Sequence, residues 1–293
     1  MTTLDKTMTI PEIVATLKDG MTIGMGGWGG RRKPMALVRE IVRSDLKDLT
    51  IVAYSGCDAG MLLSSGKVKK LVYGFATLDF IPLEAHYRKA RQAGAFEVME
   101  LDEGMLQWGL KAAANRLPYL PTRVGAASDV LKHSPHIKMV ECPYTGEPLV
   151  AMPAIKIDVA LCHVNKADKM GNSWIYGPDP FFDEWFARAA DATYLTCEEL
   201  VETEAFNDKA ETLRMPIERP LVKGVAVAEC GAHPTSCAPS YGADVKHMKT
   251  YSAAAKDGWE DYLTTYVTGK DHEGYIAEVG GAEHIRTLPL PVF

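Results

Sequence analysis

The sequence of 293 residues lacks any Cys-x-x-Cys pair, and its six cysteines are scattered along the chain. We therefore expect neither a disulfide framework nor a zinc knuckle. No segment reaches the run of about 18 apolar residues that a membrane-spanning helix requires. Residues 1–18 include acids and no long apolar stretch, which argues against a signal peptide. Together these absences predict a cytoplasmic protein without a membrane partner.

Basic clusters are also scarce. The net charge is −6, and the densest basic run is only three residues long, from Arg31 to Lys33. A nucleic-acid partner is not expected, because it would require a clustered basic face. No Gly-x-Ser-x-Gly elbow occurs, and no spacing of His, Asp or Glu suggests a metal ligand set. His163 and His233 lie in apolar or turn contexts, where hydrogen-bonded core histidines are more common than catalytic ones.

Strand-like and helix-like segments alternate along the chain. Apolar runs predict strands at 21–27, 49–55, 68–75, 96–101, 150–155, 157–164, 192–196 and 221–228. Helical patterns cover 9–17, 34–43, 83–92, 103–116, 179–190 and most of the chain from 257 onward. This alternation predicts an α/β fold with an open, mostly parallel sheet and helices on both faces. With no repeat and no linker, we expect one domain over 1–293, with ligands at the carboxyl ends of the strands.

A glycine-rich loop follows the first predicted strand, from Gly24 to Gly30, and it contains the pattern Gly-x-Gly-x-x-Gly. The acid that should end the second strand of a dinucleotide-binding unit is missing, which argues against nicotinamide binding. One interpretation is a tight turn between strand and helix. The other is a loop whose N–H groups face an anion or a developing oxyanion. The candidate residues for that second role are Gly26, Gly27, Trp28, Gly29 and Gly30.

The segment from Asp19 to Pro34 resembles the α subunits of family I CoA-transferases. Those chains carry Asp-Gly, two residues, three apolar residues, Gly-Gly-Phe, three residues and Gly-x-Pro. The spacing holds here throughout, with departures at Gly24, Trp28 and Arg32. The resemblance implies a fold of the CoA-transferase (NagB/RpiA-like) type and a separate β subunit as partner. It also implies that a transferase would take its nucleophilic glutamate from that partner, since no motif in this chain supplies one.

A second segment, Asp102-Glu103-Gly104-Met105-Leu106, is similar to the α subunits of steroid ring-opening CoA-ester hydrolases in the same superfamily. Runs that also resemble this branch are Tyr73-Gly74-Phe75, Arg116 to Pro121, and Asp179-Pro180-Phe181-Phe182-Asp183. The resemblance implies that Glu103 is the catalytic base. It also implies a substrate from late steroid degradation, a cyclic keto acid carried as its CoA thioester, with no permanently bound cofactor.

The residues around Glu103 give a separate and weaker argument. Glu103 should lie in the first turn of a helix just after a strand, with Asp102 as the N-cap. There the helix dipole favours the ionised carboxylate, which can accept a proton from water or an acidic carbon. An acid at this position can equally do no more than stabilise the helix.

Cations follow the glycine loop at Arg31, Arg32 and Lys33. Positive charge at a helix start opposes the helix dipole, which suggests that these residues bind an anion such as a substrate carboxylate or a CoA phosphate. The alternative is a solvated helix start. Arg123 is a further candidate for the substrate carboxylate.

Three functions therefore remain open from the sequence. The first is a hydrolase that opens a steroid-derived ring by a retro-Claisen type of cleavage. The second is a dicarboxylate CoA-transferase of glutaconate type, in which Glu103 is structural. The third is a binding or assembly subunit without catalytic residues.

Overall fold

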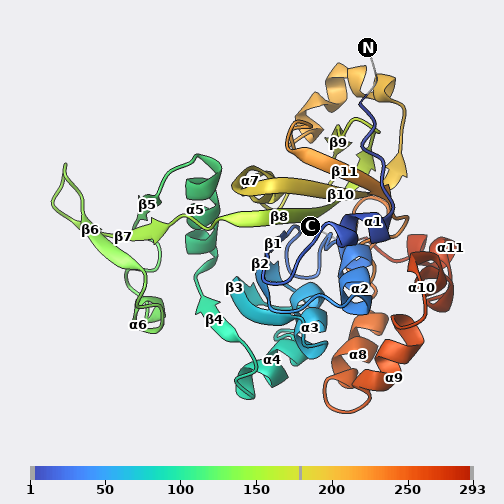
Figure 1. Cartoon of the computed structure of the whole chain (residues 1–293), viewed down its shortest axis with the longest axis horizontal. Coiled ribbons are helices and arrows are strands. Elements are labelled where there is room, and N and C mark those ends of the chain that lie inside the picture. The colour runs from blue at the N-terminus through green and yellow to red at the C-terminus, as the bar shows by residue number, and fades with distance from the viewer. Residues whose placement is uncertain (1–3, 178–179, 291–293) are drawn as a thin grey trace.

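A computed structural model describes residues 4–177 and 180–290, and it contains a large sheet with helices on both faces (Figure 1). Neighbouring strands follow the order β11-β10-β8-β1-β2-β3-β4, all parallel, and the short β9 pairs antiparallel to β8. The predicted α/β class is confirmed. The bounds are β1 Thr22–Met25, β2 Leu49–Ser55, β3 Val68–Ala76, β4 Glu97–Glu100, β8 Ile157–Ala167, β9 Ser173–Trp174, β10 Ala190–Leu200 and β11 Val222–Val227.

Helices bury their apolar faces on the two sides of this sheet. One cluster of buried residues joins the sheet to α1 Ile10–Ala15, α2 Met35–Arg43, α3 Cys57–Ser64, α4 Ala85–Gln92, α8 Val245–Ala254 and α9 Trp259–Tyr266. A second cluster joins it to α5 Glu103–Ala114 and α7 Asp183–Ala189. The remaining helical segments are α6 Val130–His133, α10 His272–Glu278, α11 Ala282–Arg286 and the 3-10 turns η1 Thr203–Asn207 and η2 Lys209–Arg214. No helix among the described residues is long and apolar enough to cross a bilayer.

Side-chain caps fix the starts of two helices where the sequence predicts them. Thr9 and Glu12 form a reciprocal capping box at α1, with Glu12 Oε2 accepting the Thr9 N–H at 2.7 Å. Asp102 caps α5 by accepting the Gly104 N–H at 2.8 Å. Each cap satisfies backbone donors that the first helical turn leaves free, so both starts are defined by local sequence.

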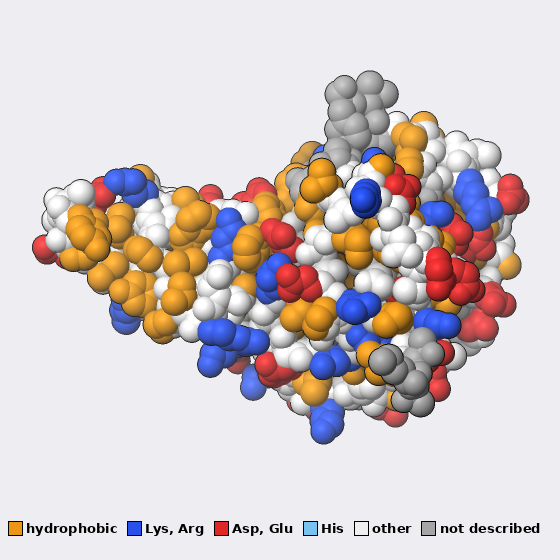
Figure 2. All heavy atoms as spheres, turned by 90° about the horizontal axis from the view of Figure 1, so that it is seen from above, with side chains coloured by type: hydrophobic (Ala, Val, Ile, Leu, Met, Phe, Trp, Pro, Cys, Tyr) orange, Lys and Arg blue, Asp and Glu red, His pale blue; other side chains and the backbone are white. Residues whose placement is uncertain are grey.

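Residues 117–154 project from the main sheet as an arm (Figure 1). The arm holds an antiparallel sheet of order β5-β7-β6, with β5 Tyr119–Thr122, β6 Lys138–Glu141 and β7 Pro148–Pro153. The strand predicted at 150–155 therefore belongs to this second sheet, and its place in the main alternation was wrong. Hydrophobic side chains gather on the arm in Figure 2. Its exposed large apolar residues are Leu117, Tyr119, Val124, Met139 and Tyr144.

Other differences are local. Helix α3 was not predicted from the sequence. The helix predicted at 179–190 is observed from Asp183, and Asp179 lies outside the described residues.

Candidate active site

Glu103 lies at the carboxyl edge of the main sheet, where the loops after neighbouring parallel strands meet. Its carboxylate Oε1 accepts a hydrogen bond from Trp28 Nε1 at 3.1 Å, and Trp28 lies in the loop after β1. Its backbone carbonyl accepts from the Tyr54 hydroxyl at 3.1 Å, and Tyr54 lies near the end of β2. Since ligands of such sheets bind beyond the carboxyl ends of the strands, this is the expected place for a site.

A glycine in β3 allows Glu103 to lie this close to the sheet. A Cβ atom at Gly74 would lie 3.0 Å from the Glu103 Cα, which is tighter than ordinary van der Waals contact. Only glycine therefore fits between the strand and the first turn of α5 without a shift of the backbone.

Aromatic rings surround the Trp28–Glu103 pair. The Trp28 ring meets Phe75 edge to face at 4.9 Å and stacks on Phe181 at 6.3 Å. Tyr54 packs on Phe182 at 5.0 Å. Burial, together with the negative charge of Glu103, raises the pKa of Tyr54, so the phenol remains a proton donor at neutral pH. The site therefore combines one carboxylate with an apolar, ring-lined wall.

The N–H groups of the glycine loop are already bonded within the protein. The prediction that they are free to bind an oxyanion is corrected, because each of the five donates to an acceptor of the chain itself. The pairs are Gly26 to the Leu161 carbonyl at 2.9 Å, Gly27 to Asp183 Oδ1 at 2.8 Å, Trp28 to the Arg31 carbonyl at 2.9 Å, Gly29 to the Tyr54 carbonyl at 3.2 Å and Gly30 to Asp79 Oδ2 at 3.2 Å. The loop is a tight turn that fixes Trp28, with positive φ at Gly27 and Gly29.

Two of the three cations after the loop lie in the interior. Arg32 pairs with Asp183 at 2.5 Å and donates to the His163 carbonyl at 2.8 Å. Lys33 Nζ lies 2.9 Å from Asp58 Oδ2, and both side chains are fully buried. A buried cation requires such a partner, because an unpaired charge is costly away from water. The structure therefore does not bring Arg32 or Lys33 to the site as anion ligands.

The other two predicted cations are accessible. Arg31 pairs with Asp79 at 3.2 Å and stacks over the Trp28 ring at 4.9 Å, with 35% of its side chain exposed. Arg123 pairs with Glu147 at 2.5 Å on the arm. Its neighbour Val124 lies against Gly104 in the first turn of α5, so Arg123 is close in the fold to the Glu103 end of that helix. Arg31 and Arg123 remain the candidates for a substrate anion.

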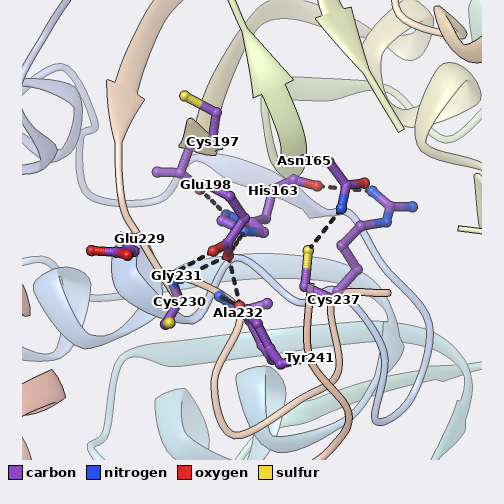
Figure 3. Close-up of polar contacts among 12 residues, drawn as sticks. His163, Asn165, Cys197, Glu198, Glu229, Cys230, Gly231, Ala232, Cys237 and Tyr241 are labelled. Atoms are coloured by element: carbon purple, nitrogen blue, oxygen red, sulfur yellow. Dashed lines mark hydrogen bonds and ion pairs between the residues drawn. The ribbon is translucent and has the colours of Figure 1, made fainter. Parts of the chain in front are cut away.

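A second carboxylate, Glu198 of β10, is the centre of a buried polar network (Figure 3). His163 Nε2 lies 2.7 Å from Glu198 Oε1, and the Tyr241 hydroxyl donates to the same oxygen at 2.7 Å. The N–H groups of Cys230 and Gly231 donate at 2.7 and 3.2 Å. Four groups thus tie strands β8 and β10 to the segment after β11. That segment also contacts the glycine loop, because the Ser236 N–H donates to the Gly30 carbonyl at 3.0 Å.

The same network offers a candidate set of metal ligands. His163, Glu198 and Cys237 each place a ligand atom within 4.8 Å of the others. However, two ligands of one tetrahedral zinc ion lie about 3.3 Å apart. The 2.7 Å separation between His163 Nε2 and Glu198 Oε1 is that of a hydrogen bond. Burial also raises the pKa of the Cys237 thiol well above its ordinary value, which opposes thiolate ligation.

Several residues of this region were missed by sequence reasoning. Tyr54, Asp79 and Glu198 each follow or end a predicted strand, so their position at the carboxyl edge of the sheet was the available signal. Asp183 stood in a quoted run, but its pairing with Arg32 crosses 151 positions and no local pattern indicates it.

The sequence and the fold match a known family. The protein-family model described as coenzyme A transferase matches residues 7–218, and the chain belongs to that family. It is 44% identical to the cholesterol ring-cleaving hydrolase IpdA subunit of Rhodococcus jostii (strain RHA1), over 92% of this chain and 94% of that protein.

Solved structures agree with this assignment. The crystal structure of glutaconate coenzyme A-transferase from Acidaminococcus fermentans superposes with a TM-score of 0.90 at 28% identity, covering 98% of this chain and 96% of that one. A variant of the decarboxylase AibA/AibB superposes with a TM-score of 0.78 at 28% identity, covering 89% of this chain and 97% of that one. The resemblance seen in the sequence, to the hydrolase branch first and the glutaconate transferase next, is confirmed.

Proposed function

We propose that this chain is the α subunit of a cytoplasmic two-subunit enzyme that opens the last ring of a steroid-derived cyclic keto-acyl-CoA by hydrolysis. The observation that carries the proposal is the Glu103 carboxylate, held half-buried against the Trp28 indole in an aromatic setting. The chain is 44% identical to a protein named as a cholesterol ring-cleaving hydrolase subunit, which supports a steroid-derived substrate. The apolar wall suits a hydrocarbon ring better than a short dicarboxylate.

In the proposed reaction Glu103 takes a proton from a water molecule, whose oxygen adds to the ring ketone. The carbon–carbon bond next to the former ketone then breaks, and its electron pair forms an enolate conjugated with the thioester. The proton held by Glu103 passes to that carbon. The ketone carbon becomes a carboxylic acid, one water is consumed, and CoA stays attached to the product.

A β subunit is proposed to complete the site, in an αβ or α2β2 assembly. The relatives support this, since they are named as subunits. The exposed apolar residues of the arm also support it, because large exposed apolar patches commonly mark surfaces that another chain covers. Arg31 and Arg123 are proposed to bind an anionic group of the substrate.

The test uses the co-expressed α and β chains with a steroid-derived cyclic keto-acyl-CoA and follows the products by mass spectrometry. The wild type is expected to form a CoA thioester heavier by one water, and Glu103→Gln is expected to lose this product while the complex remains assembled. Ring opening that continues in Glu103→Gln would contradict the assigned role of the carboxylate.

The second candidate is a glutaconate-type CoA-transferase, which the superposition on glutaconate CoA-transferase favours. In that case the nucleophilic glutamate belongs to the β subunit, and Glu103 only begins α5. The same assay separates the two functions. CoA exchange onto acetate or glutaconate that survives Glu103→Gln, without ring opening, would identify a transferase.

A further inference from the structure

The Trp28 side chain is held in place by its neighbours on several sides. The backbone N–H of Trp28 donates to the Arg31 carbonyl at 2.9 Å, and the Arg31 N–H donates to the Trp28 carbonyl at 3.0 Å. These two bonds close the backbone into a tight turn. The Arg31 guanidinium covers the ring at 4.9 Å, and Phe75 meets it edge to face at 4.9 Å. Asp79 in turn holds Arg31 at 3.2 Å. The indole therefore has little freedom to turn away from Glu103.

The backbone of Glu103 is fixed independently. Asp102 caps the helix, Tyr54 donates to the Glu103 carbonyl at 3.1 Å, and Gly74 lets β3 pass directly beneath its Cα. What remains free is the side chain, which has three rotatable bonds. The indole N–H, 3.1 Å from Oε1, restrains that side chain.

We infer that Trp28 is a positioning residue for Glu103. The indole N–H donates to Oε1, which leaves Oε2 to take the proton of the reacting water. This inference rests on the proposed function. A general base acts only within hydrogen-bond reach of the proton it removes. A misplacement of about 1 Å can lower the rate by about 100-fold. Trp28 thus acts on the rate through the orientation of the carboxylate.

The test is Trp28→Phe in the co-expressed α and β complex. Phenylalanine keeps an aromatic ring between Arg31 and Phe75 but has no N–H to donate. We expect kcat to fall by about 10- to 100-fold while KM changes by less than about threefold. An unchanged kcat would overturn the inference. A loss confined to KM would also overturn it, because Trp28 would then bind the acyl group and leave Glu103 unaffected.

Trp108→Phe is the matched control, since it removes an indole N–H from the same helix as Glu103. Trp108 Nε1 donates to the Pro121 carbonyl at 3.1 Å, on the side of the arm. Its kcat and KM should stay close to the wild type. If Trp108→Phe lowered kcat as much as Trp28→Phe does, both losses would be explained by a general loosening of α5. That result would contradict the inference.

Thermal unfolding gives a measurement that does not depend on activity. The Tm loss caused by Trp28→Phe should be smaller in a Glu103→Ala background than in the wild type, since the hydrogen bond is already absent there. An equal Tm loss in both backgrounds would show that the Trp28–Glu103 hydrogen bond does not contribute, and it would contradict the inference. Failure of the proposed function is recognised separately, by activity that persists in Glu103→Gln. If Glu103→Gln is inactive and Trp28→Phe is fully active, only the positioning role is lost.

Discussion

Glu103 and Glu198 are two carboxylates at the carboxyl side of one sheet, and they differ in how many donors they face. Glu198 accepts from His163, Tyr241 and the N–H groups of Cys230 and Gly231, with 11% of its side chain exposed. The Glu103 carboxylate is half-buried and receives the Trp28 N–H. A carboxylate can accept about four hydrogen bonds, so Glu198 is saturated, whereas Glu103 keeps capacity to accept a proton. Glu198 holds segments of the chain together, and Glu103 is available for chemistry.

The pKa of Glu198 reflects this saturation. Burial alone would raise its pKa, but the bonds from His163, Tyr241 and Cys230 outweigh burial and hold the pKa below its ordinary value. The carboxylate therefore stays ionised in the folded protein at neutral pH. It contributes stability above its ordinary pKa, and this contribution is lost as the pH falls through the lower value of the folded state.

The largest effect on stability is expected from Glu198→Ala. The change removes the acceptor of four donors and leaves them buried, which should lower the free energy of unfolding by about 4 kcal/mol. Urea denaturation of the isolated chain measures it. The neighbouring Glu199→Ala is the control, because Glu199 is exposed and pairs with Lys166 at 2.8 Å. That change should cost less than about 1 kcal/mol. Equal urea midpoints for Glu198→Ala and Glu199→Ala would show that the Glu198 network contributes no more to stability than an exposed ion pair.

The next effect separates Arg32 from its neighbour Arg31. Arg32→Met leaves Asp183 buried without its cation and should cost about 3 kcal/mol. Arg31→Met removes a partly exposed pair with Asp79 and should cost about 1 kcal/mol or less. Urea denaturation again measures both. A larger loss for Arg31→Met would mean that exposure does not set the cost of these charges.

Glu84 sharpens the comparison as a buried carboxylate whose hydrogen bonds do not offset the effect of burial on its pKa. Its Oε2 accepts the Tyr87 N–H, and Oε1 has no hydrogen-bond partner among the described residues. Burial raises the pKa of Glu84 to about 7. Between its ordinary pKa and this value the unfolded chain has released the proton while the folded protein still holds it, so rising pH favours unfolding.

Glu84→Gln should therefore gain stability over the wild type as the pH rises from 5 to 8, by about 2 kcal/mol. Denaturation curves at pH 5, 6, 7 and 8 would follow the difference, with pH 5 as the internal reference. A difference that stays constant, or that shrinks with rising pH, would contradict the raised pKa.

Local signals made much of the fold predictable. The Thr9 and Asp102 caps and the apolar strands of the main sheet depend on residues a few positions apart, and they were found where the sequence placed them. The strand at 150–155 was the exception, because its membership of the second sheet depends on pairing with the arm. Helix α3 was missed because Cys57–Ser64 carries no cap side chain and is buried around its circumference, so its sequence shows no alternation of apolar and polar faces. The arm was missed because β5 and β6 are short, and β5 contains Pro121.

The site was less predictable, because its contacts join distant segments. Glu103 was found through a motif, but its donor Trp28 lies 75 positions away. Four of the five acceptors of the glycine loop come from distant segments of the chain, so the sequence could not show that its N–H groups were already used. Arg32 and Lys33 looked like surface cations, because their partners Asp183 and Asp58 are brought to them only by the fold.

The backbone at Phe181 and Phe182 has a consequence for engineering. Both residues have positive φ, 51° and 66°, a conformation that costs about 1 kcal/mol or more for a side chain of this kind. Glycine or asparagine would relieve that strain, but removing a buried ring such as that of Phe181 costs about 3 kcal/mol or more in lost packing, which outweighs the relief. The rings also contact Trp28 and Tyr54. Substitutions that are chosen only to relax the backbone are therefore expected to lose both stability and turnover here, and both positions are best kept fixed in any design for heat resistance.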